Sequence, residues 1–302
     1  MDVLLTANQA FGHYYMATRE YDNSVPSYID YDKTNTTAIL EYRGNYTFPS
    51  DPIFPSTNLP SFEDFIATDN FLSRLRSLAS HDHPSDVPKS ITTRMFITVS
   101  MNRILCPNSS CNGDTSQVKL ASSLNSISFV TPNTNILSAY YWNLSGVYTT
   151  DFPDQPFSYY NFTREDLSIN TTVSTQGTKV KMLNYNETIK IKFQGTNVLD
   201  TSETHPMHLH GYNFYVAGSG YGNFDPEIDP EGYNLVDPLH VNTIAVPTNG
   251  WVTVRFIANN PVRNGSTLKT SMREPPANLP QCKASFATWL QVLDDLDKYV
   301  PK

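Results

Sequence analysis

The stretch Glu203-Thr-His-Pro-Met-His-Leu-His-Gly-Tyr-Asn-Phe-Tyr-Val-Ala-Gly218 holds three of the seven histidines of this 302-residue chain within six residues. On an extended backbone His208 and His210 leave the same face, and the leucine between them points the other way, into a core. Pro206 restricts the backbone beside His205 and stiffens the approach to the pair. Imidazoles on one rigid edge suit a borderline metal such as copper or zinc. The alternative interpretation is a strand end that carries surface histidines.

Five more segments accompany the motif: Met1–Gln9, Thr37–Tyr42, Phe71–Ser77, Asn234–Pro238 and Asn242–Pro247. Together with the motif they resemble, in the usual order, the C-terminal part of a multicopper oxidase, and specifically of a plant laccase. The resemblance extends from Met1 to about Cys282. It implies that His205 is a type 1 copper ligand, His208 a type 2 ligand and His210 a type 3 ligand.

The resemblance also implies a reaction. Laccases couple the one-electron oxidation of phenols and monolignols to the reduction of dioxygen to water, in lignin metabolism. The family uses four copper ions: a type 1 copper held by two histidines and a cysteine, and a trinuclear cluster that gathers four electrons. Phenolic small molecules and dioxygen are then the partners, and the apoplast is the compartment.

The ligand set that the resemblance implies is incomplete in this sequence. The family's first domain supplies further His-x-His motifs, and a closing His-Cys-His segment supplies the rest, but this sequence contains neither. Its remaining histidines are His13, His81, His83 and His240. The phrase Val254–Pro261 normally leads into the His-Cys-His segment, whereas here Val262 begins sequence that resembles what lies beyond it. We therefore expect a piece with an internal deletion, inactive alone. The alternative is a catalytically dead extracellular glycoprotein, or an interaction module, that binds metal weakly.

Composition favours an all-β fold. Charged residues make up only 17% of the chain, which has 18 Tyr, 16 Phe and 21 Pro. This balance is poor in helix formers and rich in residues that favour strands. Apolar and polar residues alternate in Arg94–Ser100, in Ile189–Phe193 and in Trp251–Ile257. Several such strands separated by turns predict a Greek-key sandwich, which the family resemblance makes cupredoxin-like.

We divide the chain into four segments. By resemblance, residues 1–47 are the last strands of a second cupredoxin domain, and residues 87–261 are an incomplete third one. Residues 48–86 are a proline-rich linker with short helices, and residues 262–302 form a tail. Strands are expected at 3–6, 14–18 and 37–42. Short helices are expected over 61–65 and over 69–79, the second with apolar residues at helical spacing through Leu78. An amphipathic helix is expected in the tail, with Phe286, Leu290, Leu293 and Leu296 on one face.

Charge and sequence motifs bear on partners and compartment. The net charge of −8 argues against a nucleic-acid partner, and no apolar run is long enough to span a bilayer. The sequence starts without the pattern of a signal peptide. Eight Asn-x-Ser/Thr acceptor sites nevertheless indicate a secretory origin. They are Asn35, Asn45, Asn108, Asn143, Asn161, Asn170, Asn186 and Asn264.

The three cysteines fit the same setting. Cys106 and Cys111 flank a short turn-rich segment and are predicted to form a disulfide, with two free thiols as the alternative. By resemblance, Cys282 pairs with the first domain, so we expect a free thiol there. Asp237 and Glu203 lie near the histidine motif, where they either support metal ligands or are solvated loop charges, and the second interpretation is favoured.

Overall fold

The computed structural model describes residues 4–19, 34–47, 59–62, 64–106, 118–200, 202–260, 285–288 and 290–292. The chain divides into two compact units, Met1–Leu75 and Arg76–Lys302. The first unit includes the predicted segment of residues 1–47, and the second includes the predicted segment of residues 87–261. The finer boundaries at residues 47, 86 and 261 stay predictions.

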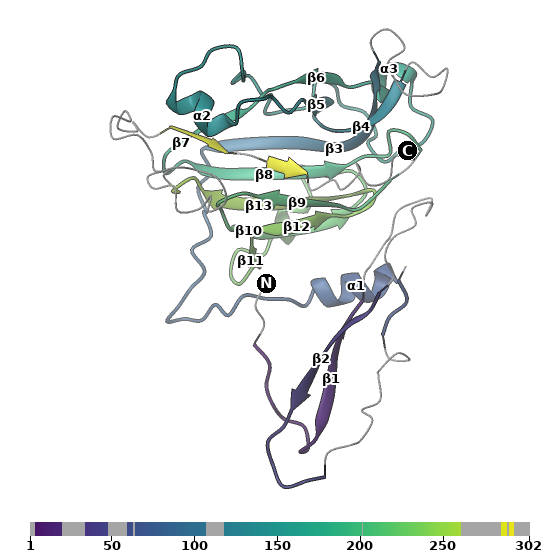
Figure 1. The fold of residues 1–302 in the computed structure, drawn as a ribbon, viewed down its shortest axis with the longest axis vertical. Coiled ribbons are helices and arrows are strands. Elements are labelled where there is room, and N and C mark those ends of the chain that lie inside the picture. The colour runs from purple at the N-terminus through teal and green to yellow at the C-terminus, as the bar shows by residue number, and fades with distance from the viewer. Residues whose placement is uncertain are drawn as a thin grey trace. The chain divides into compact units, whose positions relative to one another are not determined.

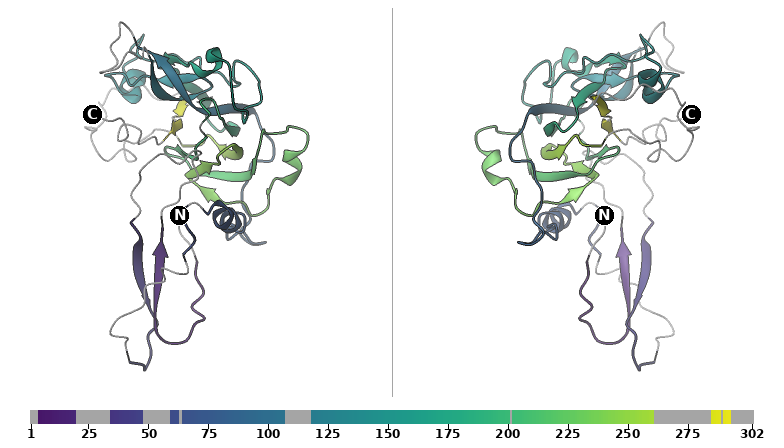
Figure 2. Two further views of the ribbon diagram at one scale, coloured as in Figure 1. Left: turned by 90° about the vertical axis from the view of Figure 1, so that its right-hand side faces the viewer. Right: turned by 90° about the vertical axis from the view of Figure 1, so that its left-hand side faces the viewer.

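The first unit contains a β-hairpin. Strands β1 (His13–Thr18) and β2 (Thr36–Glu41) run antiparallel, with His13 opposite Glu41, and they lie side by side in Figures 1 and 2. The strands predicted at 14–18 and 37–42 are therefore confirmed. The strand predicted at 3–6 is wrong for Leu4–Thr6, because no described strand lies beside this segment to accept its backbone hydrogen bonds.

One helix, α1 (Phe65–Leu72), belongs to the same unit. It begins where the side chain of Asp64 accepts a hydrogen bond from the backbone N–H of Ala67 at 2.9 Å, as an N-cap residue does. The predicted helical spacing continued to Leu78, whose side chain is instead 76% exposed. The helix therefore begins before residue 69 and ends at Leu72, so the helix predicted over 69–79 is confirmed only for residues 69–72.

The second unit is built mainly from strands, which confirms the all-β prediction. Their bounds are β3 (Thr93–Leu105), β4 (Val118–Leu124), β5 (Ile127–Phe129), β6 (Thr175–Gly177), β7 (Lys181–Asn184), β8 (Thr188–Gly195), β9 (His205–Leu209), β10 (Phe214–Tyr221), β11 (His240–Val241), β12 (Thr243–Val246) and β13 (Gly250–Ile257). The connections hold α2 (Ile136–Tyr141), α3 (Ile169–Thr172) and the 3-10 helix η2 (Asp229–Gly232). None of the described helices is long and apolar enough to cross a membrane.

Strand order brings distant parts of the chain together. Eight strands form one sheet in the order β11-β10-β13-β8-β3-β4-β5-β6. In it β3 runs parallel to β8, and β8 runs antiparallel to β13 with Ile191 opposite Val254. Strand β9 lies in a separate sheet, antiparallel to β12, with His208 opposite Thr243. Figure 1 shows β3, β8, β13 and β10 in succession.

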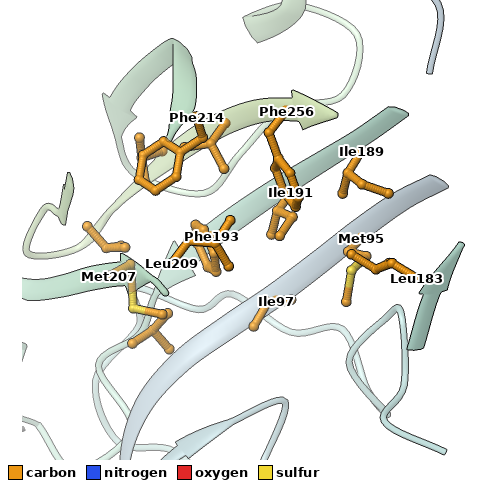
Figure 3. Packing of buried hydrophobic residues seen from close by; sticks show 14 of the residues in the cluster. Met95, Ile97, Leu183, Ile189, Ile191, Phe193, Met207, Leu209, Phe214 and Phe256 are labelled. Carbon is orange, nitrogen blue, oxygen red and sulfur yellow. The ribbon is translucent and has the colours of Figure 1, made fainter. Parts of the chain in front are cut away.

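The core lies between the large sheet and β9, as Figure 3 shows. On β8 the side chains of Ile189, Ile191 and Phe193 are buried in this core, whereas Lys190 and Lys192 point to the other face, as their alternation predicts. The buried cluster comprises Met95, Ile97, Val99, Leu183, Ile189, Ile191, Phe193, Met207, Leu209, Phe214, Val246, Val252, Val254, Phe256 and Ala258. The two sheets are therefore held together by one continuous apolar layer.

The helix predicted in the tail is wrong for its described residues. Ser285–Thr288 form strand β14, which pairs with β7, and Leu290–Val292 form β15, which pairs with β9. Unpaired strand edges accept backbone hydrogen bonds from any extended segment. This pairing outweighs a short helical spacing of apolar residues. Leu293 and Leu296 lie outside the described residues.

We predict that Phe193→Ala lowers the free energy of unfolding of the chain by about 3–5 kcal/mol, the usual cost of removing a buried aromatic ring. Phe193 is 1% exposed at the centre of the core. Phe157→Ala, at a side chain that is 70% exposed, is the matched control and should change stability by less than about 0.5 kcal/mol. Urea denaturation measures both, and equal losses would contradict this core.

Candidate metal site

Strand β9 sorts the histidines of the motif onto two faces. His205 is 5% exposed, and it shares its face with Met207 and Leu209, each 1% exposed, which pack in the core. His208 is half-buried on the other face, and His210 is exposed beyond the end of the strand. The predicted common face of His208 and His210 is therefore confirmed, as is the inward direction of Leu209.

His208 and His210 form a pair of neighbouring imidazoles. Their ring centroids are 5.6 Å apart and their planes are inclined by 60°. The chain turns directly after His210 at Gly211, whose φ of +79° favours glycine. The carbonyl oxygen of Gly211 accepts a hydrogen bond from the side-chain amide of Asn260 at 2.7 Å, and this bond ties the turn to the end of β13. The position of His210 is thus set by the turn as well as by the strand.

The protonation of the His208 ring follows from its neighbours on β12. His208 Nδ1 lies 2.9 Å from Thr243 Oγ1, and the Thr243 hydroxyl donates to Asn242 Oδ1 at 3.0 Å. A hydroxyl has one proton to donate. Because Thr243 gives that proton to Asn242, it accepts the hydrogen bond from Nδ1–H of His208. The neutral ring then keeps the lone pair of Nε2 free to bind a metal.

Thr243 is the functional residue that reasoning from the sequence did not single out. It lies 35 residues from His208 in the chain, and the contact depends on the register between β12 and β9. In the sequence, the segment Asn242–Pro247 contributes only to the family resemblance. A local sequence pattern does not give the register between two strands, so the sequence alone could not show that Thr243 lies opposite His208.

His205 does not join the pair. His208 stands three positions after it, and this odd spacing places the two side chains on opposite faces of the strand. Burial lowers the pKa of His205 to about 4, so its imidazole is neutral at ordinary pH. No group of three or more His, Cys, Asp or Glu side chains that could hold a metal occurs among the described residues. The three imidazoles of the motif therefore do not lie together, and the copper roles implied for them stay predictions.

Two of the remaining histidines have other neighbours in the second unit. His240 stacks on Tyr215, with centroids 4.3 Å apart and an interplanar angle of 13°, on strands of the large sheet. His81 lies beside Asp82 at the surface. Asp237 accepts a hydrogen bond from the side-chain amide of Asn234 at 2.8 Å, and its Oδ1 lies 3.7 Å from Nε of Arg76.

Cysteines and glycosylation sites are only partly within the described residues. Cys106 is disulfide-bonded. Cys111 and Cys282 lie outside the described stretches of the chain, so the predicted pairing stays a prediction. Among the acceptor asparagines, Asn35 is half-buried and Asn108 and Asn264 lie outside. The exposed ones are Asn45, Asn143, Asn161, Asn170 and Asn186.

Comparison with known proteins shows which proteins this chain is similar to. A family model described as multicopper oxidase matches residues 148–263, which include the histidine motif. The chain is 42% identical over 305 residues to Laccase-14 of Arabidopsis thaliana, covering 93% of this chain and 51% of that protein. It is 40% identical over 303 residues to Laccase-24 of Oryza sativa subsp. japonica, covering 90% and 51%.

Residues 148–263 form a multicopper oxidase domain. Its all-β fold is the cupredoxin-like fold that the resemblance implies, and copper is the metal of this family. A mutant laccase of Botrytis aclada is a structural neighbour, with a TM-score of 0.44 and 19% identity over 84% of this chain and 37% of that one. The chain spans about half the length of the curated laccases that it matches.

We predict that Thr243→Val shifts the proton of the neutral His208 ring from Nδ1 toward Nε2, because valine cannot accept a hydrogen bond. Nitrogen NMR of the metal-free chain reports the tautomer directly. Loss of a partner that orients a ligand typically weakens metal binding by about 10–100-fold, which a Cu²⁺ titration measures. Thr243→Ser keeps the hydroxyl and should behave as the parent. An unchanged tautomer in Thr243→Val would contradict the assignment.

We predict that the metal-free chain loses stability as pH falls through the range from about 6.5 to about 4. The folded pKa of His205 is lowered to about 4, while the unfolded chain takes up a proton near pH 6.5. The unfolded state therefore binds more protons in this window, and the loss is on the order of 3 kcal/mol.

The control for this pH effect is His205→Leu, which removes the buried titrating group. Comparing its urea denaturation with that of the parent between pH 7 and pH 4 isolates the contribution of His205. The variant should lose less stability across that range. Parallel pH profiles for the two chains would show that His205 is not the group responsible.

Proposed function

We propose that this chain supplies one imidazole-bearing portion of a laccase-like copper oxidase and has no oxidase activity alone. In this proposal His208 and His210 belong to the type 2 and type 3 coppers, and His205 belongs to the type 1 copper. The complete enzyme would oxidise phenols and reduce dioxygen to water. The observation that supports the proposal best is that His208 and His210 lie together on the outward face of β9, whereas His205 lies on its buried face.

The donor chemistry of the pair fits copper. Two imidazoles on one strand end are the ligand type that copper accepts, and the hydrogen bond from His208 to Thr243 leaves Nε2 of His208 as the free donor atom. Their centroid separation of 5.6 Å allows either one shared ion or two neighbouring ions. With no third donor at the pair among the described residues, the remaining positions must come from elsewhere.

Among the described residues, no cysteine thiolate is available for the type 1 position. Copper, when bound, supplies one-electron chemistry, and in a type 1 site a cysteine thiolate is one of the ligands. Cys106 is disulfide-bonded and has no thiolate to offer. His205 is held neutral by burial and so can contribute an imidazole. The chain's own residues therefore bind and orient, and the oxidation of a phenol needs groups beyond them.

A secretory setting belongs to this proposal. Five of the acceptor asparagines are exposed, as attachment of a glycan requires. A secreted route is also compatible with the disulfide at Cys106, since disulfides persist in oxidising compartments. The alternative of an interaction module uses the β-sandwich together with an acidic helix in the tail, and the described tail residues are strands in place of that helix.

We predict that the metal-free chain binds Cu²⁺ specifically and that His208→Ala combined with His210→Ala removes most of this binding. Isothermal titration measures both, and His240→Ala is the control because His240 lies on the large sheet. The copper-loaded parent should show no intense blue thiolate absorption and no phenol oxidation above that of free Cu²⁺. Turnover at full copper loading would overturn the proposal, as would equal binding by the double variant.

A further inference from the structure

A row of three cations crosses the large sheet on the face opposite the core. Arg94 on β3 lies opposite Lys190 on β8, and Lys190 lies opposite Arg255 on β13. Adjacent strands are about 4.8 Å apart, so the three positions fall within about 10 Å. Their chain neighbours Met95 and Ile189 point into the core, which places the row on the outer face. We call Arg94, Lys190 and Arg255 the basic row.

The basic row has no acidic partner within the described residues. None of the ion pairs in those stretches of the chain includes any of its three members, although the chain has 29 acidic residues and a net charge of −8. Like charges directly opposite each other on a sheet destabilise it. Burial lowers the pKa of Lys190, and the charges of Arg255 and Arg94 lower it further. The repulsion within the row is therefore uncompensated.

Arg255 forms the rigid, buried end of the row. Its side chain is 8% exposed, its Nη1 donates to the carbonyl oxygen of Pro88 at 2.9 Å, and its guanidinium lies 5.6 Å from the ring centroid of Tyr233. Its Nε is enclosed and has no hydrogen-bond partner. Lys190 is half-buried and Arg94 is exposed. Exposure to solvent thus increases along the basic row, from the buried Arg255 through Lys190 to Arg94.

The next outward lysine on the same strand is in a different situation. The ammonium of Lys192 lies 4.7 Å from the ring centroid of Phe96 and 4.4 Å from that of Phe224. Aromatic faces attract a cation and partly replace its water. Lys192 therefore has aromatic partners that are not found for Arg94 or Lys190 among the described residues, although burial and the charge of Lys190 lower the pKa of Lys192. Lys192 therefore has a structural role, whereas Lys190 is available to a ligand.

At its other end the row is closed by Tyr215, which lies opposite Arg255 on β10. Tyr215 is stacked on His240. Burial raises the pKa of Tyr215. A hydrogen bond with the backbone of Asp86 lowers this pKa, and the charge of Asp86 raises it. The opening to solvent is consequently on the side of Arg94 and Lys190.

We propose that the basic row is a binding site for a multiply charged oxyanion, either an inorganic ion such as sulfate or a cluster of carboxylate groups. Arg94 and Lys190 donate the hydrogen bonds, and the buried charge of Arg255 adds attraction from behind. Guanidinium and ammonium groups are the usual donors to such anions. The site lies on the opposite face of the sandwich from His208 and His210, so it is independent of the copper ligands.

The test is a titration of the full chain with sodium sulfate at constant ionic strength, balanced with sodium chloride and followed by calorimetry and thermal unfolding. Sulfate should raise the unfolding temperature above that in chloride. Lys190→Gln should weaken sulfate binding by about tenfold or more, the loss expected for one hydrogen bond to a charged group. Without sulfate the same variant should be at least as stable as the parent, because it relieves repulsion.

Lys192→Gln is the matched control, since it removes the same charge from the same strand face and should leave sulfate affinity unchanged. A parallel titration with citrate distinguishes the two sources, because tighter binding of citrate points to carboxylate groups and tighter binding of sulfate to an inorganic oxyanion. Equal affinities for sulfate in Lys190→Gln and Lys192→Gln would overturn the proposal. So would the same stabilisation by chloride, sulfate and citrate.

Discussion

Burial of Met207 and Leu209 between the two sheets determines where every histidine of the motif points. Side chains alternate along a strand, so a slip of one residue would move these two into solvent and bring His208 into the core. Each apolar side chain contributes roughly 1.5–3 kcal/mol when fully buried, and both are 1% exposed. The slip is therefore strongly disfavoured, and the apolar residues between the histidines set the direction of the imidazoles.

The pairing of β9 with β12 adds a second level of control. It puts Thr243 opposite His208, and the hydroxyl of Thr243, itself committed to Asn242, selects the tautomer that leaves Nε2 of His208 available. On the buried face, exclusion of water keeps His205 neutral. Two different physical effects thus act on the imidazoles of one short motif, a directed hydrogen bond at His208 and desolvation at His205.

The features of this structure that depend on local alternation could be predicted from the sequence. The inward faces of Ile189–Phe193 and Trp251–Ile257, and the common face of His208 and His210, follow from a period of two. Strand order and register could not be predicted in this way. The contact between Thr243 and His208, and the row of Arg94, Lys190 and Arg255, depend on pairings between distant segments. The tail shows the converse, because pairing with β7 and β9 replaced a helix that local spacing favoured.

The separation of the outward pair from the buried histidine can be tested directly by counting the imidazoles bound to Cu²⁺. Pulsed electron paramagnetic resonance of the chain loaded with one equivalent of Cu²⁺ resolves coordinated imidazole nitrogens. The structure predicts two imidazoles, reduced to one by His208→Ala or by His210→Ala and unchanged by His205→Leu. A third imidazole that disappears in His205→Leu would contradict the opposite faces of β9 on which this account rests.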